Sequence, residues 1–452
     1  MMRRISAALV AVFLVLTGLV AAASPVQAGG SHPPRHAAKL RPIVFVHGFF
    51  GSGSQYETPA RRFASNGYPA RYVEAHEYDS TFATTTVADV QNALDARIDR
   101  LLRETGADKV DLVGHSLGTA VSQSYLNSSP ARAARVAHYV NLDGATATAL
   151  PGGVPTLAIW GEGNDARSIT GATNVHLSDE SHTQTVTSAP SFAAQFEFLT
   201  GHKPRTTLVL PQLGHVELAG RAVLFPSNAG AEGAILRVYQ VNPRTGRRVG
   251  RGPVATQTLG ADGAFGPIRA NGWASYEFEL RRTNSNNVHH LYFQPFRRSD
   301  RLVRLLTSLP NTGLDLLTEH SDRHVNLIVT RNKEWWGDQG AGSDTLEING
   351  TNVLSAATAP RTKRSIAVFA FDAGLDGVSH PDASIPALAM LPFITGVDLF
   401  VPAANPPAGV VRLASRQRGA NGATDVVNVP NWPSSTDRVS VQFNDYHQSR
   451  WW

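Results

Sequence analysis

The 452-residue sequence contains no cysteine, which excludes disulfide bonds and a thiol nucleophile and leaves packing and polar contacts to stabilise the fold. An excess of charge of one sign is also lacking. The formal net charge is +5 and no run of basic residues occurs, so nothing indicates nucleic-acid binding. A chain of this length exceeds the usual size of a single core, and two domains are expected.

Apolar runs long enough to span a membrane are lacking after the N-terminal segment. Met1 to Arg4 is basic, Ile5 to Ala23 is apolar, and Val26-Gln27-Ala28 is typical of a small-residue cleavage site. This pattern predicts a signal peptide over residues 1–28, a linker over 29–40 and a secreted, extracellular protein. An uncleaved membrane anchor is the alternative, because the apolar run approaches the length of a span.

Residues 41–204 alternate between strand-like and helix-like segments, which predicts an α/β domain with a parallel sheet covered by helices on both faces. The predicted strands are 43–46, 70–77, 110–113, 136–142, 156–160 and 174–177, and the predicted helices include 57–66, 87–104 and 192–199. Residues 205–452 contain many short β-rich runs separated by Gly, Asn, Asp and Pro turns. This second domain is predicted to be all-β, a barrel or a sandwich, with helices only at 301–308 and 386–391.

Residues 110–120, VDLVGHSLGTA, place Ser116 in a G-x-S-x-G motif between an apolar strand and a helix-compatible stretch. This is the setting of a nucleophile elbow, in which glycines permit a sharp turn that exposes the serine hydroxyl. The N–H of Leu117, at the start of the helix, is predicted to face a developing oxyanion. Such a short motif also recurs by chance, and an inert serine in a glycine-bracketed turn is the alternative.

A His-Gly loop follows the first predicted strand. In His47-Gly48-Phe49 the N–H of Phe49 is expected to be the second oxyanion donor of an α/β-hydrolase. Two amides aimed at a developing alkoxide stabilise it without reorganising during the reaction. His47 itself is expected to hold the loop in place rather than to act as a base.

A serine nucleophile needs a histidine base and an acid that orients it, in the chain order Ser, acid, His. His182 lies in a polar loop between the last predicted strand and the last predicted helix, where the base of this fold belongs; His138, His176 and His202 lie elsewhere. Asp143 and Asp165 both follow predicted strands whose ends meet the same edge of the sheet. The residues alone leave the acid open between these two.

Several longer runs resemble the archaeal alkaline lipase family: RPIVFVHGFFGSGSQYE, GADKVDLVGHSLGT, YLNSSPARAARVAHYVNLDG, ATNVHLSDESHTQ, FDAGLDGVSHPD and VSVQFNDY. The resemblance covers nearly the whole mature chain and implies an α/β-hydrolase domain followed by a C-terminal β-barrel lipid-binding domain. Matching motifs imply Ser116 as nucleophile, His182 as base, Asp143 as acid, and the amides of Phe49 and Leu117 as oxyanion donors. Asp165 becomes the second choice for the acid.

One departure from the family concerns the lid. The family has a sizeable helical lid between the strand ending near Glu77 and the helix beginning near Val87, where this chain has only residues 78–86. A shortened lid implies an open cleft and puts lid-controlled interfacial activation in doubt. Phe50 and Phe82, with Phe49, are predicted to line its mouth and bind substrate, with ordinary packing as the alternative.

The second domain offers two weaker patterns. Asp372 and Asp376 stand as in a calcium loop, but a clear distal glutamate is missing and a plain Asx-turn is favoured. The pairs Trp335-Trp336 and Trp451-Trp452 suit adsorption to a lipid or polymer surface, although burial at strand edges is favoured.

Together these features predict a secreted carboxylester hydrolase of lipase type that needs no metal or organic cofactor. Its expected partners are ester substrates, acylglycerols or similar lipids, and residues 205–452 are expected to supply an apolar wall for the acyl chain. A short-chain esterase, an aliphatic polyester hydrolase and a secreted binding protein with a degenerate hydrolase domain remain as alternatives.

Overall fold

A computed structural model describes residues 40–163 and 165–447. The predicted signal peptide, nearly all of the predicted linker and the pair Trp451-Trp452 lie outside these residues. Among the helices of the described ranges, none has the length and apolar character needed to pass through a bilayer.

The N-terminal part is built on a six-stranded sheet in the order β2-β1-β3-β4-β5-β6, in which every neighbouring pair is parallel. The strands are β1 (Ile43–Val46), β2 (Val73–His76), β3 (Val110–His115), β4 (Val136–Leu142), β5 (Thr156–Trp160) and β6 (Thr173–His176). This arrangement confirms the predicted parallel sheet. The predicted strand 70–77 begins with a 3-10 turn, η2 (Ala70–Tyr72), before the chain enters β2.

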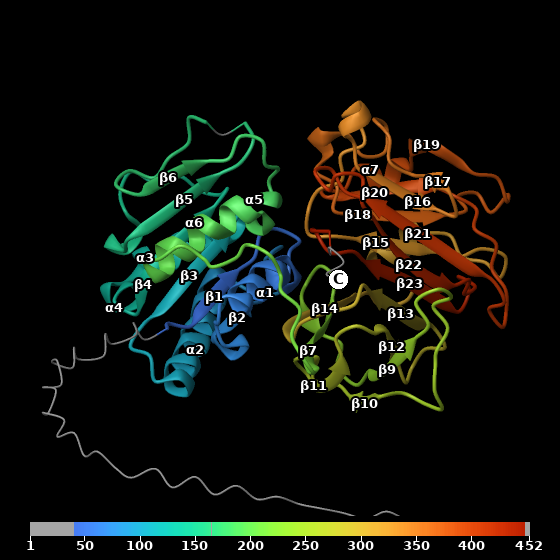
Figure 1. Cartoon of the computed structure of the whole chain (residues 1–452), viewed down its shortest axis with the longest axis horizontal. Coiled ribbons are helices and arrows are strands. Elements are labelled where there is room, and N and C mark those ends of the chain that lie inside the picture. Colours follow the sequence, from blue (N-terminus) through green and yellow to red (C-terminus); the bar gives the residue numbers. More distant parts are fainter. Residues whose placement is uncertain (1–39, 164, 448–452) are drawn as a thin grey trace, which may run out of the picture. The chain divides into compact units, whose positions relative to one another are not determined.

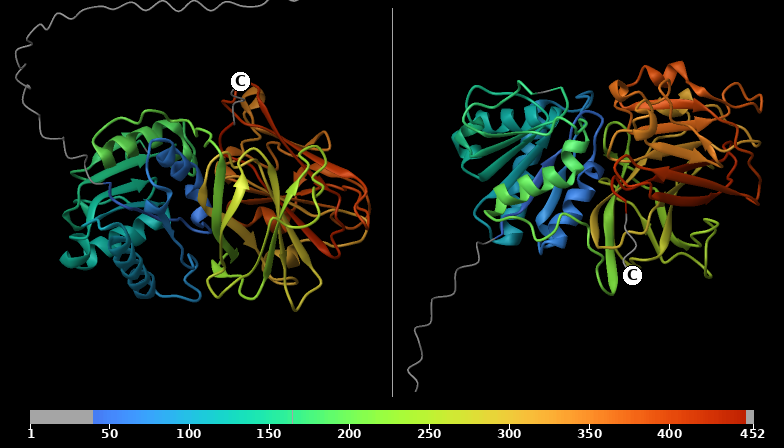
Figure 2. Two further views of the ribbon diagram at one scale, coloured as in Figure 1. Left: turned by 60° about the horizontal axis from the view of Figure 1, so that its bottom comes forward. Right: turned by 45° about the horizontal axis from the view of Figure 1, so that its top comes forward.

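Helices cover both faces of this sheet (Figures 1 and 2). They are η1 (Gly53–Tyr56), α1 (Glu57–Ser65), α2 (Val87–Thr105), α3 (Leu117–Ser128), α4 (Pro130–Ala133), η3 (Pro151–Gly153), α5 (Gln184–Thr187) and α6 (Ala189–Thr200). Successive side chains of a strand point to opposite faces. In β1, Ile43 and Phe45 pack with α1 and α6 on one face, whereas Val44 and Val46 pack with α2 and α3 on the other.

The C-terminal part is rich in strands, and its described residues, up to 447, form three sheets (Figure 1). One has nine strands in the order β10-β9-β12-β13-β23-β15-β18-β20-β19, the second runs β11-β7-β14 with β8 paired to β7, and the third runs β17-β16-β21-β22. The strands are β7 (His215–Leu224), β8 (Ala229–Gly230), β9 (Ile235–Val241), β10 (Ala255–Thr258), β11 (Ala264–Asn271), β12 (Ser275–Arg281), β13 (Val288–Phe293), β14 (Asp300–Thr307), β15 (Leu327–Thr330), β16 (Thr345–Ile348), β17 (Thr351–Asn352), β18 (Ala367–Phe371), β19 (His380–Ser384), β20 (Ile394–Asp398), β21 (Val410–Arg416), β22 (Thr424–Pro430) and β23 (Asp437–Gln442). Short helices interrupt these strands at η4 (Gly313–Leu317), η5 (Gly340–Gly342), η6 (Arg361–Lys363) and α7 (Pro386–Ala389).

Two helix predictions in this part have different outcomes. The helix predicted at 386–391 is present as α7, whereas the helix predicted at 301–308 is wrong, because these residues form β14. The apolar residues of the segment suit a helix as well as a strand. These residues form a strand because they pair with β7, from Val303 opposite Gly220 to Thr307 opposite Leu224.

Buried ionic contacts connect the N-terminal part to the C-terminal strands. The Arg61 Nε of α1 donates to Asp300 Oδ2 of β14 at 2.7 Å, and both side chains are nearly inaccessible. Glu77, directly after β2, pairs with Arg304 of β14 and Arg221 of β7. Burial would raise the pKa of Glu77, but the two guanidinium groups outweigh it and lower that pKa to about 2. Glu77 is therefore ionised at neutral pH.

Candidate active site

Ser116 lies between the end of β3 and the start of α3, in a backbone conformation with φ 53° and ψ −123°. A left-handed φ at a non-glycine residue is strained and is typical of functional turns. The glycines beside it are sterically required. A β-carbon on Gly118 would lie 2.1 Å from the Val46 carbonyl oxygen, and one on Gly114 would lie 2.7 Å from the Gly118 carbonyl oxygen. The local geometry is therefore that of the predicted elbow.

His182 and Asp143 form a short hydrogen bond, with 2.6 Å between His182 Nδ1 and Asp143 Oδ2. Asp143 follows β4 and is 3% exposed, and its second oxygen accepts from the Gly161 N–H at 3.0 Å. Burial would raise the pKa of Asp143, but the hydrogen bonds from His182 and Gly161 outweigh it and lower that pKa. An ionised Asp143 holds the proton of the neutral imidazole on Nδ1, which leaves Nε2 free to accept.

Asp165, the second choice for the acid, lies in a different environment. Its side chain is exposed, and Oδ1 accepts from the Ser178 hydroxyl at 2.5 Å. Between the two aspartates that the residues alone left open, the structure thus pairs Asp143 with His182.

The serine and the His–Asp pair both lie at the carboxyl edge of the sheet. The Ser116 N–H donates to the carbonyl of Leu142, the residue before Asp143, at 3.0 Å. The ring of His115 lies 4.6 Å from the ring of His182. In the part of the chain that the structure describes, no hydrogen bond joins the Ser116 hydroxyl to His182. Such contacts are often long in unliganded enzymes and shorten when substrate binds.

Two backbone amides adjoin Ser116. A β-carbon on Gly48 would lie 2.9 Å from the Ser116 β-carbon, so the His-Gly loop lies directly against the serine. Among the described residues, the N–H of Phe49 in this loop and the N–H of Leu117 in the first turn of α3 have no hydrogen-bond acceptor. Both predicted donors are thus available to an added oxygen atom.

The buried histidines beside the site serve to hold it together. His47 Nδ1 donates to the Gly48 carbonyl at 2.9 Å, and Nε2 accepts from the N–H of Tyr78 at 3.3 Å. His115, which the sequence did not single out, contacts the His182 carbonyl through Nε2 at 3.1 Å. Burial and the neighbouring His182 lower the pKa of His115 to about 3, so it stays neutral.

Phe50 and Phe82 lie in different surroundings. The ring of Phe50 stacks on Phe49 at 4.1 Å and meets Phe225 of the C-terminal part edge-on at 5.3 Å. Phe82 is partly buried and packs against Tyr78 at 5.9 Å. The contact with Tyr78 is ordinary packing, and a role of Phe82 in substrate binding stays a prediction.

The connection between β2 and α2 is short and internally hydrogen-bonded. The Asp79 carboxylate accepts from both the N–H and the hydroxyl of Thr81 and of Thr84. Thr86 then begins α2 in a capping box with Asp89. No described residue between Glu77 and Thr86 belongs to a helix.

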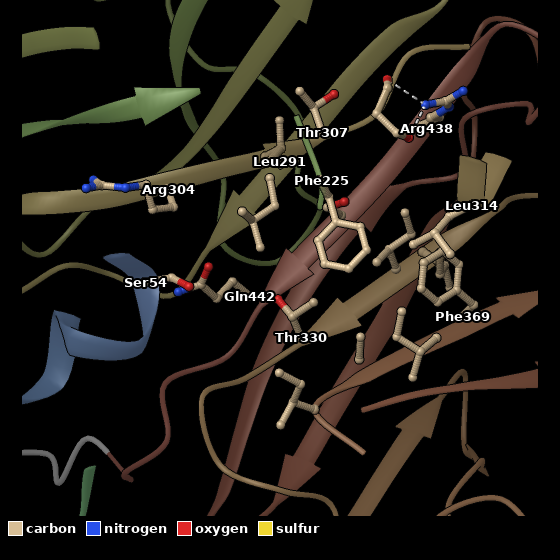
Figure 3. A pocket seen from close by; sticks show the side chains of 18 of the residues that line it. Ser54, Phe225, Leu291, Arg304, Thr307, Leu314, Thr330, Phe369, Arg438 and Gln442 are labelled. Atoms are coloured by element: carbon tan, nitrogen blue, oxygen red, sulfur yellow. Dashed lines mark hydrogen bonds between the residues drawn. The ribbon is translucent and has the colours of Figure 1, made fainter. Parts of the chain in front are cut away.

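A cavity of about 130 Å³ lies against Phe50 and extends into the C-terminal sheets (Figure 3). Its wall is largely apolar and includes Phe225, Leu291, Leu306, Leu314, Ile328, Phe369, Phe371 and Ile394. Gln55 lies in the same wall and accepts from the Gly48 N–H at 3.3 Å. Ser116, Asp143 and His182 are not in the wall, so the cavity and the site share only the loop between Gly48 and Gln55.

In the described residues, both weaker patterns of the C-terminal part make internal contacts. Asp372 accepts from the Gly377 N–H at 3.1 Å, and Asp376 accepts from the Val378 N–H at 2.8 Å in an Asx-turn, the favoured interpretation. Trp335 and Trp336 are buried, and guanidinium groups stack on both rings. Their burial, also the favoured interpretation, removes them as a surface for adsorption.

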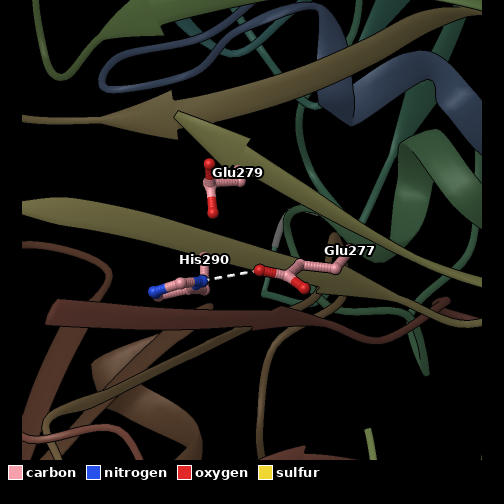
Figure 4. Close-up of side chains that lie close together, drawn as sticks. All are labelled: Glu277, Glu279 and His290. Atoms are coloured by element: carbon pink, nitrogen blue, oxygen red, sulfur yellow. Dashed lines mark hydrogen bonds and ion pairs between the residues drawn. The ribbon is translucent and has the colours of Figure 1, made fainter. Parts of the chain in front are cut away.

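Glu277, Glu279 and His290 form a buried cluster with metal-ligand chemistry (Figure 4). Basic side chains of the protein itself already pair with the two carboxylates of this cluster. Arg248 donates to Glu277 at 2.6 Å and to Glu279 at 2.5 Å, while His290 bridges Glu277 at 2.6 Å and Asp437 at 2.8 Å. Burial would lower the pKa of His290, but its bonds to Asp437 and Glu277 outweigh it and raise that pKa. The cluster is an internal salt-bridge network.

Comparisons with known families agree with this architecture. Residues 43–211 match the model of the α/β hydrolase family, residues 214–310 match that of a lipase C-terminal domain, and residues 313–447 match a further C-terminal-domain model. Solved structures with similar regions include the mature lipase BlEst2 of Bacillus licheniformis, 18% identical, covering 37% of this chain and 96% of that chain with a TM-score of 0.29. Lipase B of Aspergillus fumigatus is 14% identical, with 39% and 57% of the two chains covered and a TM-score of 0.30. The family matches support a lipase-like α/β-hydrolase.

Proposed function

We propose that this protein is a secreted serine hydrolase of carboxylic esters, with Ser116 as nucleophile, His182 as base and Asp143 as the acid that orients it. The observation that carries the proposal is the 2.6 Å bond between His182 and Asp143 beside a strained serine at the end of β3. The pattern of residues 1–28 supports export.

The proposed reaction proceeds through an acyl-enzyme. Ser116 Oγ attacks the ester carbonyl while His182 Nε2 takes its proton, and the amides of Phe49 and Leu117 stabilise the oxyanion. His182 returns the proton to the departing alcohol as the C–O bond breaks. The same histidine then activates water, which releases the acid and restores Ser116.

The cavity beside Phe50 supports substrates with a long apolar acyl chain over short-chain esters. Phe50 follows the oxyanion donor Phe49 in the sequence and lies in the cavity wall. An acyl chain that extends past the Phe50 ring therefore reaches the cavity. Each buried methylene contributes about 0.8 kcal/mol of binding free energy. Acylglycerols fit these requirements, and an aliphatic polyester, whose repeating chain is also apolar, is the second candidate.

Substitution of the nucleophile tests the proposal. Ser116→Ala is expected to lower kcat on chromogenic esters by about a million-fold, because the covalent route is removed. Circular dichroism and thermal unfolding should match those of the unsubstituted protein. Substantial turnover by a pure, folded Ser116→Ala protein would refute the mechanism, and an unsubstituted protein inert towards every ester would favour the alternative of a degenerate binding protein.

A further inference from the structure

The loop that carries His182 is held by a carboxylate from the C-terminal part. Glu334, in the segment between β15 and β16, is fully buried. Its Oε1 accepts from the N–H of Thr183 at 2.5 Å and its Oε2 accepts from the hydroxyl of Ser181. One carboxylate thus binds both chain neighbours of His182, from 151 residues away in the sequence.

Arg418 binds both Glu334 and the loop that carries His182, and Asp344 pairs with Arg418. Arg418 donates to the backbone carbonyl of Glu334, to the Ser181 hydroxyl at 3.1 Å and to Gln184 Oε1 at 2.8 Å. It also pairs with the buried Asp344 at 2.7 Å. Charge-assisted bonds of this kind are short and directional, so the loop has little freedom to move.

Glu334 also acts on His182 through its charge. Burial would raise the pKa of Glu334, but hydrogen bonds from Ser181 and Thr183 and the charge of a protonated His182 outweigh it and lower that pKa. By reciprocity, ionised Glu334 stabilises the imidazolium that forms at His182 during catalysis. Asp143 and the neutral His115 are the other titratable groups that face His182.

A second contact from the C-terminal part holds the oxyanion loop. Asn228, buried between β7 and β8, donates from Nδ2 to the carbonyl of Gly51 at 2.8 Å and to that of Tyr78 at 3.1 Å. The same nitrogen lies 3.2 Å from Nε2 of His47. The carbonyl of His47 in turn accepts from the Tyr78 hydroxyl at 2.8 Å. Asn228 therefore fixes the loop that contains the Phe49 amide and lies against the serine.

We infer that Glu334 is a positioning residue of the active site, so that the C-terminal part, which also holds the oxyanion loop through Asn228, completes the catalytic geometry as well as providing the cavity. The inference rests on the proposed function. Because the buried Ser181 hydroxyl and Thr183 N–H have Glu334 as their shared acceptor, a change there frees the histidine loop directly. A displacement of about 1 Å in a catalytic group lowers a rate by roughly 100-fold.

The test is Glu334→Gln in the full-length protein, with Asp300→Asn as a matched control. Glutamine keeps the size of the side chain but removes the charge and one acceptor, whereas Asp300 is an equally buried carboxylate that pairs with Arg61 and contacts neither catalytic loop. We expect Glu334→Gln to lower kcat on a butyrate ester by roughly 10- to 100-fold with little change in KM. The acid limb of its kcat/KM profile should move to lower pH, because the imidazolium loses a favourable charge.

A readout without catalysis separates this inference from the proposed function. In protein carrying ¹³C-labelled histidine and Ser116→Ala, the ring signal of His182, assigned with His182→Asn, should titrate at lower pH once Glu334→Gln is added. An unsubstituted protein without ester turnover would refute the proposed function, yet this titration would still decide the role of Glu334. An unmoved titration, with a loss of kcat no larger than that of Asp300→Asn, would overturn the inference.

Discussion

Asp143→Asn probes the proposed acid with almost no change in size. The Gly161 N–H points at Oδ1 of this side chain at 3.0 Å, so the asparagine would keep its carbonyl oxygen there. Its NH₂ group would then face His182 Nδ1 at the former 2.6 Å contact. An NH₂ donor forces Nδ1 to accept, which moves the proton of the neutral imidazole to Nε2. The nitrogen that should take the proton of Ser116 is then already protonated.

The expected loss in kcat is about 10⁴-fold, the effect of a wrong histidine tautomer in a serine triad. At about 1.4 kcal/mol for each factor of ten, this corresponds to a rise of roughly 5.5 kcal/mol in the activation free energy. Initial rates on a p-nitrophenyl ester measure it, and Asp165→Asn, which removes only an exposed charge and keeps an acceptor for the Ser178 hydroxyl, should stay within about twofold of the unsubstituted protein. A greater loss in Asp165→Asn than in Asp143→Asn would refute the assignment.

Three further changes test the cavity, the buried ion pair and the elbow. Ala367→Phe places a ring in the cavity wall and should lower the rate of hydrolysis of palmitate esters at least about tenfold while that of acetate esters changes little. Equal losses on both esters would show that the cavity does not bind the acyl chain. Glu77→Gln leaves Arg304 and Arg221 short of a buried partner and should cost about 3–5 kcal/mol in the free energy of unfolding at pH 7. The stabilisation by Glu77 is complete above its usual pKa of about 4.5 and is lost as pH falls through about 2, so urea unfolding of the two proteins should converge at low pH. Gly118→Ala sets a methyl group 2.1 Å from the backbone oxygen of Val46, and urea unfolding should show a loss of at least about 1–3 kcal/mol.

The strands and helices of the N-terminal part follow from local pattern, because each buries a clear apolar run or stripe. The strands predicted at 43–46, 136–142 and 156–160 have the same bounds in the structure. The elbow is equally local, since its glycines and serine are adjacent in the chain. The choice of acid is not local. Asp143 directly follows β4, Asp165 lies in the loop after the neighbouring β5, and only the path of these loops decides which one meets His182.

The strands and side-chain contacts of the C-terminal part are harder to predict from local sequence pattern. The strand β13, with the sequence VHHLYF, contains two histidines and was not predicted, yet both are buried. His289 contacts Ser440 at 2.8 Å and His290 contacts Asp437 at 2.8 Å, partners that lie far along the chain. Glu334 and Asn228 were missed for the same reason, since their contacts span more than 140 residues.

The position of β23 imposes an order of assembly on the molecule. This strand follows all the others in the chain, yet it lies between β13 and β15 and pairs in parallel with both. Before it inserts, the nine-stranded sheet exists as two halves, each with an unpaired edge that is open to association with another chain. Such distant parallel pairing generally forms slowly, and we expect the two open edges to favour aggregation until β23 is in place. A chaperone that shields those two edges would raise the yield of folded enzyme without altering the finished structure.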